Sequence, residues 1–561
     1  MTPRADQGGN SSQVPAAPEL RAAAESPAAP QGSGNSLARV VGSGMTWILI
    51  ATLISKAGAT IQQVLLGYLL IPEDFGLWAT SASAAALVNW LKDAGVRDLL
   101  IQRGEKEFHR LEGSVFWLAM TVNLLAAFLL ASLAPALPSI VHATSTVFAS
   151  VLPGLVPAEG MTLPEQWSDP KLNQLLVAWA IWMPVQTLGS LTTARLQMLL
   201  RFADTSRIMT SMALLKCVLT VLFAWLGFGP LSMVLPFIVC SCLEATWGYL
   251  LLRDKIWAKP VDPSIWPGIL GNTKWLMLGV LGTNLFEWGG ILAGGLRVTD
   301  DILGLYVFAR QIPMQIFIVL SSNLKIVLFP TLSTFKDDLP RMADATLRAL
   351  RVQMLITAPA CLGLALIAEP LVRAVWRNGQ WKDAALPAAI LSVFFAFRIT
   401  FGLTTSVLTA VGKFKAWALL TILEGVGLGV AAGIGAGMKG SATAIALAVG
   451  MYLMVSRLLM ILFMCRAIRL NPLAAMLAVL PPWGWSVAVA FGCTFFRTLF
   501  FANRGPITEV VGLGLIFTVL FIYGTRLLMP VRMNEFVQIL PGRIRASLRA
   551  VLRLPELGKP V

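Results

Sequence analysis

Charged residues are scarce in this chain. Asp, Glu, Lys and Arg together make up 13% of its 561 residues, whereas 56% are hydrophobic. A soluble domain needs a largely polar and charged surface, and little of the sequence is left for one. A separate globular enzyme domain is therefore not expected.

Histidine and cysteine are equally sparse. The two histidines, His109 and His142, fall in different predicted loops, and all six cysteines fall within apolar stretches. Cys240 and Cys242 are the closest pair, but no histidine is near enough to complete a zinc site with them. Cysteines in apolar surroundings act as small packing residues. We expect no disulfide framework, no metal site and no cofactor.

Long apolar stretches dominate what remains. About fourteen of them, each roughly 20 residues long, match the hydrocarbon thickness of a bilayer as helices. In the bilayer core, only helices and closed barrels satisfy their own backbone hydrogen bonds. The sequence thus predicts an all-α polytopic membrane protein. The predicted spans are residues 44–69, 75–96, 114–141, 174–199, 208–228, 231–252, 275–296, 302–328, 347–368, 386–411, 416–436, 440–465, 475–496 and 507–529.

The formal net charge of +15 has a topological explanation. Most of the Lys and Arg residues lie in connections on one side of the predicted membrane, such as those containing Arg103 and Arg253. Positive charge concentrates on the cytoplasmic side of membrane proteins. We predict a multi-pass protein of the bacterial cytoplasmic (inner) membrane with both termini in the cytoplasm. Nucleic-acid binding is not needed to explain the charge.

The two ends of the chain differ from the apolar part. Residues 1–36 are rich in Pro, Ala, Gly and Ser, which predicts a disordered cytoplasmic tail. Residues 532–561 form a basic tail, which either sets the topology or forms an interfacial helix with Ile544 and Leu548 on its apolar face. Between the tails we predict helices 1–6 in residues 37–273, helices 7–12 in 274–465, and helices 13–14 in 466–531.

An internal repeat relates two of these segments. Residues 73–78 (EDFGLW) open the second span, and residues 301–306 (DILGLY) open the eighth span, 228 positions later. Both follow an odd-numbered span, so both run in the same direction through the membrane. This predicts two pseudo-symmetric halves, an arrangement in which transporters carry substrate between the halves. Chance similarity of two helix starts is the alternative, because acids and glycines are common there.

Several motifs resemble one family. The run IPEDFGLWATSASAAALVNWLKDAGVRDLLIQR (71–103) is similar to the second helix of Wzx-like polysaccharide transporters, which are oligosaccharide flippases of the MOP superfamily. Residues 194–208, 302–315 and 375–391 resemble later segments of that family in the same order. The resemblance implies a MOP/MATE-like fold. It also implies alternating-access transport of a lipid-linked oligosaccharide or polysaccharide precursor, with membrane lipids around it and a polysaccharide polymerase and glycosyltransferases as candidate partners.

Such a substrate carries a pyrophosphate, so a cavity between the halves should offer cations at membrane depth. Ionisable residues at that depth are costly and usually face a cavity or a partner. Arg310 lies about 12 Å below the outer end of span eight, at 1.5 Å per residue. Arg398 and Lys56 lie near the centres of spans ten and one, and Lys216 at mid-depth in span five. We expect these four cations to bind substrate, and structural pairing is the alternative.

Three carboxylates in the spans admit two interpretations. Glu244, Glu287 and Glu424 could be counter-ions of the cations, or Glu287 and Glu424 could carry a coupling proton.

Two other functions fit parts of the sequence. A MOP-type drug or metabolite antiporter would share the architecture. A membrane glycosyltransferase or polymerase would need an acidic constellation at the membrane surface, and the best candidate, Asp300–Asp301, is already explained as a helix start. We therefore expect a transporter and not an enzyme.

Overall fold

The computed structural model describes residues 54–91, 105–133, 164–199, 201–253, 255–333, 338–501 and 504–539, with a few isolated positions besides. Every regular element in these ranges is a helix, and ten helical segments are long and apolar enough to cross a membrane. The other predicted spans coincide with helix 54–69, α2, α9–α10 and α11. The predicted all-α polytopic membrane fold is confirmed. Residues 1–36, the loop 142–163 and nearly all of 540–561 lie outside the described residues.

The first group of helices follows helix 54–69. It comprises α2 (Pro72–Val88), α4 (Glu105–Leu133), α6 (Pro170–Met198), α7 (Phe202–Trp225) and α8 (Leu235–Leu252).

The second group begins with α9 (Trp266–Asn284), which continues through a π-helical turn (Leu285–Gly289) into α10 (Gly290–Gly295). It goes on with α11 (Asp300–Ser333), α12 (Leu339–Val375), α13 (Ala385–Arg398), α14 (Thr400–Ala410), α15 (Phe414–Lys439) and α16 (Ala442–Ile468). Two further long helices, α17 (Pro472–Phe496) and α18 (Pro506–Leu528), precede the short α19 (Pro530–Ile539).

Local sequence explains many of the helix ends. Proline stands at the first position of α2, α6, α17 and α18, where its missing N–H is not needed. Asp169 caps α6 by accepting a hydrogen bond from the Lys171 N–H at 2.8 Å. At the other end of a helix, Gly440 takes a left-handed conformation that ends α15.

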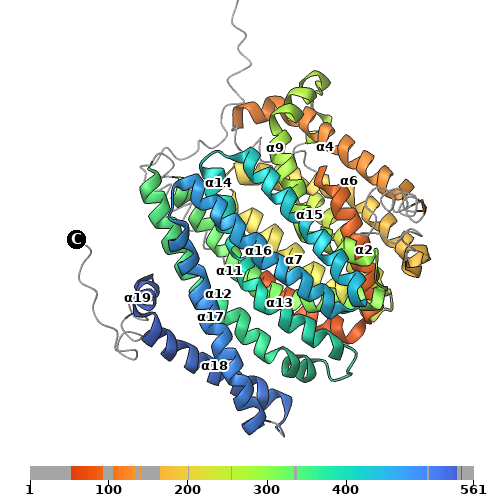
Figure 1. Ribbon diagram of the computed structural model, residues 1–561. Helices are drawn as coiled ribbons and strands as arrows, with labels where there is room; N and C mark the ends of the chain where they lie inside the picture. Colours follow the sequence, from red (N-terminus) through yellow and green to blue (C-terminus); the bar gives the residue numbers. More distant parts are fainter. Residues whose placement is uncertain are drawn as a thin grey trace, which may run out of the picture.

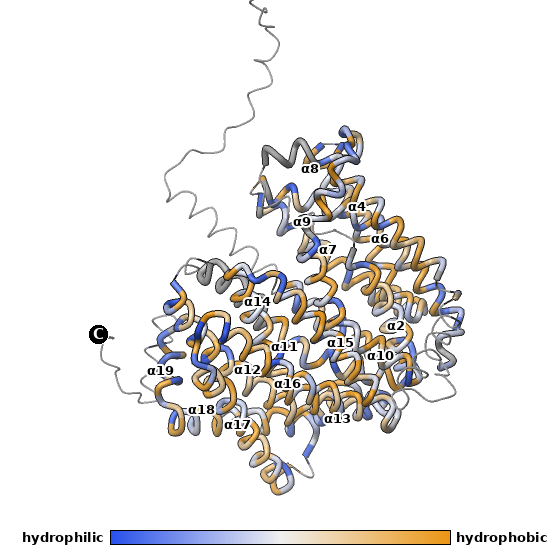
Figure 2. The backbone as a smooth tube through the Cα atoms, turned by 45° about the horizontal axis from the view of Figure 1, so that its top comes forward, coloured by the Kyte–Doolittle hydropathy of each residue, from blue (hydrophilic) through white to orange (hydrophobic). Residues whose placement is uncertain are grey.

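The helices pack side by side into one bundle (Figure 1). α4 and α6 lie at one edge, and α18 and α19 lie at the opposite edge, beyond α12 and α17 (Figure 1). Hydrophobic residues cover most of the helices, whereas hydrophilic residues gather at helix ends and connections (Figure 2). This distribution is that of a protein whose outer surface faces lipid.

The internal repeat has a direct structural counterpart. α2 and α11 pack closely along each other, and each brings a glycine against the backbone of the other helix. A Cβ atom on Gly76 would come within 1.9 Å of the Asp300 carbonyl oxygen, and one on Gly304 within 1.8 Å of the Pro72 carbonyl oxygen. Gly76 and Gly304 are 228 positions apart, and so are Pro72 and Asp300. The two contacts are therefore related by the pseudo-symmetry of the halves, as the repeat predicted.

A second contact closes the same end of the bundle. Helix 54–69 ends with backbone carbonyls that have no partner within the helix, and the connection after α12 supplies donors for the Gly67 carbonyl and for a carbonyl one turn earlier. Gln380 and Trp381 donate to the Gly67 carbonyl at 2.6 and 2.7 Å, and Trp376 donates to the Val64 carbonyl at 3.1 Å. The two groups of helices are thus held together at the end that the charge distribution predicts to be outside.

Candidate functional site

Two of the predicted cations share one carboxylate inside the bundle. Arg310 on α11 lies 3.0 Å from the Glu287 carboxylate and donates to the Glu287 backbone carbonyl at 2.9 Å. Arg398, the last residue of α13, forms an ion pair with the other carboxylate oxygen of Glu287. The structure therefore brings together three residues that were predicted separately, from three different helices.

Glu287 owes its position to the π-helical turn between α9 and α10. A π turn inserts an extra residue into a helix and changes the direction of the side chains, and such turns are frequent at functional sites. The Glu287 side chain is 29% exposed and that of Arg310 is 14% exposed, although both lie in membrane-spanning segments. These two side chains are therefore only partly buried.

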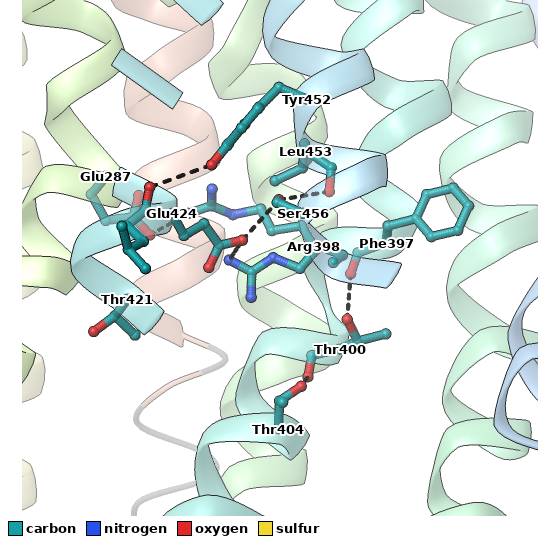
Figure 3. A network of polar contacts seen from close by, with 12 residues as sticks. Glu287, Phe397, Arg398, Thr400, Thr404, Thr421, Glu424, Tyr452, Leu453 and Ser456 are labelled. Atoms are coloured by element: carbon teal, nitrogen blue, oxygen red, sulfur yellow. Dashed lines mark hydrogen bonds and ion pairs between the residues drawn. The ribbon is translucent and has the colours of Figure 1, made fainter. Parts of the chain in front are cut away.

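A second ion pair adjoins the first and is fully buried. Arg457 on α16 pairs with Glu424 on α15, and their side chains are 0% and 3% exposed. Ser456 donates a hydrogen bond to the same Glu424 oxygen at 3.0 Å. Figure 3 shows Glu287, Arg398, Glu424 and Ser456 close together between the helices. One of these charges without the other would be very costly here, so each residue stabilises the other.

Phe286 joins the two ion pairs. The guanidinium carbons of Arg398 and Arg457 lie 4.7 and 4.5 Å from the centre of its ring, so the ring contacts both cations. Together, the three arginines and two glutamates carry a net formal charge of +1. Arg398 Nε and Arg457 Nη1 are buried without a hydrogen-bond partner. We refer to Arg310, Arg398, Arg457, Glu287 and Glu424 as the arginine cluster.

The other predicted site residues lie elsewhere. Lys56 is on helix 54–69 and Lys216 on α7, where its Nζ atom stands 4.4 Å from the centre of the Phe237 ring. Glu244 accepts a hydrogen bond from Thr193 at 2.8 Å and makes no ion pair within the described part of the chain. Its suggested counter-ion role is therefore not seen, and the substrate-binding role of the lysines stays a prediction.

Sequence reasoning missed Arg457. It lies as deep in its helix as the predicted cations, so the same depth criterion would have found it. Its pairing with Glu424 was not foreseeable, because the two residues lie on different helices. The described residues contain no group of three or more His, Cys, Asp or Glu that could hold a metal ion.

The comparisons with known proteins agree with this architecture. The polysaccharide biosynthesis protein family matches residues 65–156 and 139–386, which is more than half of the chain. The chain belongs to this family.

Two curated relatives are named for polysaccharide biosynthesis, and one of them is named as a transport protein. The succinoglycan biosynthesis transport protein ExoT of Rhizobium meliloti is 24% identical over 410 residues, 71% of this chain and 73% of ExoT. The lipopolysaccharide biosynthesis protein WzxC of Escherichia coli is 26% identical over 361 residues, 61% of this chain and 64% of WzxC.

Among solved structures, the lipid II flippase MurJ in an inward closed conformation has the same fold. The TM-score is 0.64 at 12% identity, with 86% of this chain and 98% of the MurJ chain covered. This likeness supports the MOP-like fold that the sequence motifs implied.

Proposed function

We propose that this protein moves a lipid-linked oligosaccharide or polysaccharide precursor across the bacterial cytoplasmic membrane by alternating access. The arginine cluster carries the proposal, because it places three cations, of which Arg310 is partly exposed, at membrane depth between helices of a polysaccharide biosynthesis protein. The name of ExoT supports transport in glycan biosynthesis, and the name of WzxC supports a role in polysaccharide biosynthesis. The oligosaccharide and its pyrophosphate would cross inside the bundle, while the hydrocarbon chain stays in lipid.

Arg310 and Arg398 would pair with Glu287 while no substrate is bound, and they would bind the substrate pyrophosphate once it enters. The planar guanidinium group suits phosphate oxygens, and charge-assisted hydrogen bonds are the strong ones. Before substrate binds, Glu287 offsets the cost of two arginines at membrane depth. Phosphate would then displace the carboxylate from one or both of them.

Alternating access would use the contacts at the predicted outer end. The glycine contacts of α2 and α11, and the donors that cap helix 54–69, hold the two groups of helices together there. Release of these contacts would open the interior toward that side. No bond of the substrate is made or broken in this cycle, so we propose a transporter and not an enzyme.

One alternative function loses support from the ion pairs, and the other from the position of its acidic residues. A proton-coupled antiporter would need an accessible carboxylate free of cations, but Glu287 is held by two arginines and Glu424 is buried against Arg457. A membrane glycosyltransferase or polymerase would need Asp300 and Asp301 as acidic site residues. Both lie in the first turn of α11, where acidic residues stabilise the start of a helix. We propose that the pathway in which the protein works sets which glycan and carrier lipid it moves. The same pathway would supply a polymerase and glycosyltransferases as partners.

Deletion of the gene tests the functional class. Oligosaccharide-loaded lipid carrier should accumulate on the cytoplasmic leaflet, and the surface glycan should disappear. Normal surface glycan together with normal carrier loading, in cells without a second transporter of this family, would refute the proposal.

The proposed orientation can be tested with cysteines in a cysteine-free background. Ser168 and Asn378 are exposed in connections that we place outside, whereas Glu105 begins α4 at the predicted cytoplasmic side. Ser168→Cys and Asn378→Cys should react with an impermeant thiol reagent in intact cells, and Glu105→Cys should not. The opposite pattern would invert the topology.

A further inference from the structure

A cationic cavity lies at the predicted outer end of the bundle. It has a volume of about 650 Å³ and is formed by the end of α12, the connection that follows it and the start of α18. Arg373, Arg377 and Lys382 line it, and its described walls contain no Asp or Glu. Trp376 forms another part of the wall. The cavity therefore suits an anion.

Cations at this end of the bundle are unusual. Lys and Arg residues of membrane proteins concentrate on the cytoplasmic side, and most of those in this chain follow that rule. Arg377 and Lys382 lie on the side that we predict to be outside, and they make no ion pair within the described part of the chain. Neither topology nor an internal salt bridge explains them. Two such cations at one cavity point to an anionic ligand.

The third cation is held in place by its surroundings. Arg373 lies 2.9 Å from the carboxylate of Glu509, a buried residue of α18. Arg497, in the π-helical turn after α17, pairs with the other oxygen of that carboxylate. Glu509 thus fixes Arg373 at the cavity wall, although the Arg373 side chain stays nearly half exposed. A cation that is already ordered loses little conformational freedom when an anion binds.

A second cavity adjoins the first at Lys382, which lines both. Its volume is about 740 Å³, and it lies between the outer ends of α11, α12, α13, α16 and α17. Its walls include hydroxyl groups and carboxylates, from Ser441, Thr443, Thr494, Glu369 and Asp383.

This lining suits sugars better than a phospholipid head group. Sugar hydroxyls can donate hydrogen bonds to carboxylates and exchange them with the hydroxyls of Ser and Thr. A phospholipid phosphate would instead be repelled by Asp383, which has no ion-pair partner among the described residues. The two cavities together therefore match an oligosaccharide that carries an acidic group.

Both cavities adjoin the contacts that close the predicted outer end. Trp376, in the wall of the first, donates a hydrogen bond to the Val64 carbonyl of helix 54–69. Ile302 and Leu305, in the wall of the second, lie on either side of Gly304 in α11. A glycan that leaves the bundle at this end would pass the two cavities.

We propose that the two cavities form an exit site for the glycan, in which Arg373, Arg377 and Lys382 bind the carboxylate of an acidic sugar. This inference rests on the proposed function, and it narrows the substrate class to acidic oligosaccharides. The site differs from the arginine cluster in place and in ligand, because the cluster lies inside the bundle and binds the pyrophosphate. Binding outside would oppose return of the glycan through the bundle.

Binding of a galacturonic acid trimer to the purified full-length protein in phosphatidylcholine nanodiscs tests the inference. Arg377→Gln and Lys382→Gln should each weaken binding about threefold to tenfold, as expected for loss of one charge-assisted hydrogen bond in a partly exposed site. The carboxyl-reduced trimer, which is neutral, should bind far more weakly. Equal binding of the acidic and neutral trimers, or no binding of either, would overturn the inference.

Lys171→Gln is the matched control. Lys171 is an exposed lysine on the same predicted side of the membrane, at the start of α6. This variant should bind the trimer like the wild type. Equal weakening by Lys171→Gln would mean that outside charge alone attracts the probe, and unchanged binding by both cavity variants would remove the site. Competition by phosphatidylglycerol as strong as that by unlabelled trimer would assign the cavities to lipid and contradict the inference.

Surface glycan, measured separately in cells, distinguishes this inference from the proposed function. Normal export by the wild type, combined with Arg377→Gln and Lys382→Gln variants that bind the trimer normally, would leave the function standing and remove the site. Trimer binding that depends on the two cations, combined with normal surface glycan and carrier loading after deletion of the gene, would keep the site and remove the function.

Discussion

Gly76 lies so close to Asp300 that a Cβ atom on the glycine would come within 1.9 Å of the Asp300 carbonyl oxygen. Gly304 meets Pro72 in the symmetry-related way. The motif repeated in the sequence is therefore one place where the two halves touch. A transporter that alternates between two states must be able to break this contact, and glycine allows it to form without interlocked side chains.

Replacing Gly76 or Gly304 with alanine should weaken the contact of α2 with α11, which closes the predicted outer end of the bundle. The added Cβ cannot be accommodated without a backbone shift, and overpacking costs about 1–3 kcal/mol. A difference of about 1.4 kcal/mol changes a population tenfold. A cysteine at Ala79, which is fully buried on α2, should then react with a thiol reagent about ten times faster in Gly76→Ala and Gly304→Ala.

Gly492→Ala is the matched control, since nothing lies within 4 Å of a Cβ at that position of α17. It should leave the reactivity of the Ala79→Cys reporter unchanged. Equal reactivity in all three glycine variants would mean that the close contact of α2 and α11 does not limit opening.

The buried Arg457–Glu424 pair makes a prediction about stability. Glu424→Gln leaves a fully buried arginine without its counter-charge, which should cost about 3–5 kcal/mol. Thermal unfolding of the purified protein should shift to lower temperature. The double variant Arg457→Met, Glu424→Gln should recover much of the loss, because no unpaired charge remains. A double variant less stable than Glu424→Gln would contradict a purely structural pair.

The two arginines that pair with Glu287 should behave differently. Arg310→Ala and Arg398→Ala should accumulate in the membrane yet lose glycan export, because the pyrophosphate loses its partners at mid-membrane. Arg→Lys should recover part of the export, since charge is kept while the planar fork is lost. Surface glycan relative to protein level in the same cells is the measurement. Loss of protein together with export would instead favour structural pairing with Glu287, and near-normal export would refute the role.

The sequence predicted the fold more fully than the site. Helix spans follow from hydropathy, because the bilayer imposes the same length on each of them. Arg310 and Arg398 were found because a charge at membrane depth is rare. Glu287 was named as one possible counter-ion of these cations, but its sharing by both arginines was not predictable, since the π-helical turn that positions it leaves no distinct pattern in the sequence.

The central claim is tested most directly by reconstitution. The purified protein is placed in liposomes that carry lipid-linked oligosaccharide from cells that contain the gene, and a lectin outside the liposomes detects the sugar in the outer leaflet. Our account predicts that the sugar initially confined to the inner leaflet becomes accessible with time, and that Arg310→Ala slows this strongly. Accessibility that never exceeds that of protein-free liposomes, with folded wild-type protein present, would contradict the account.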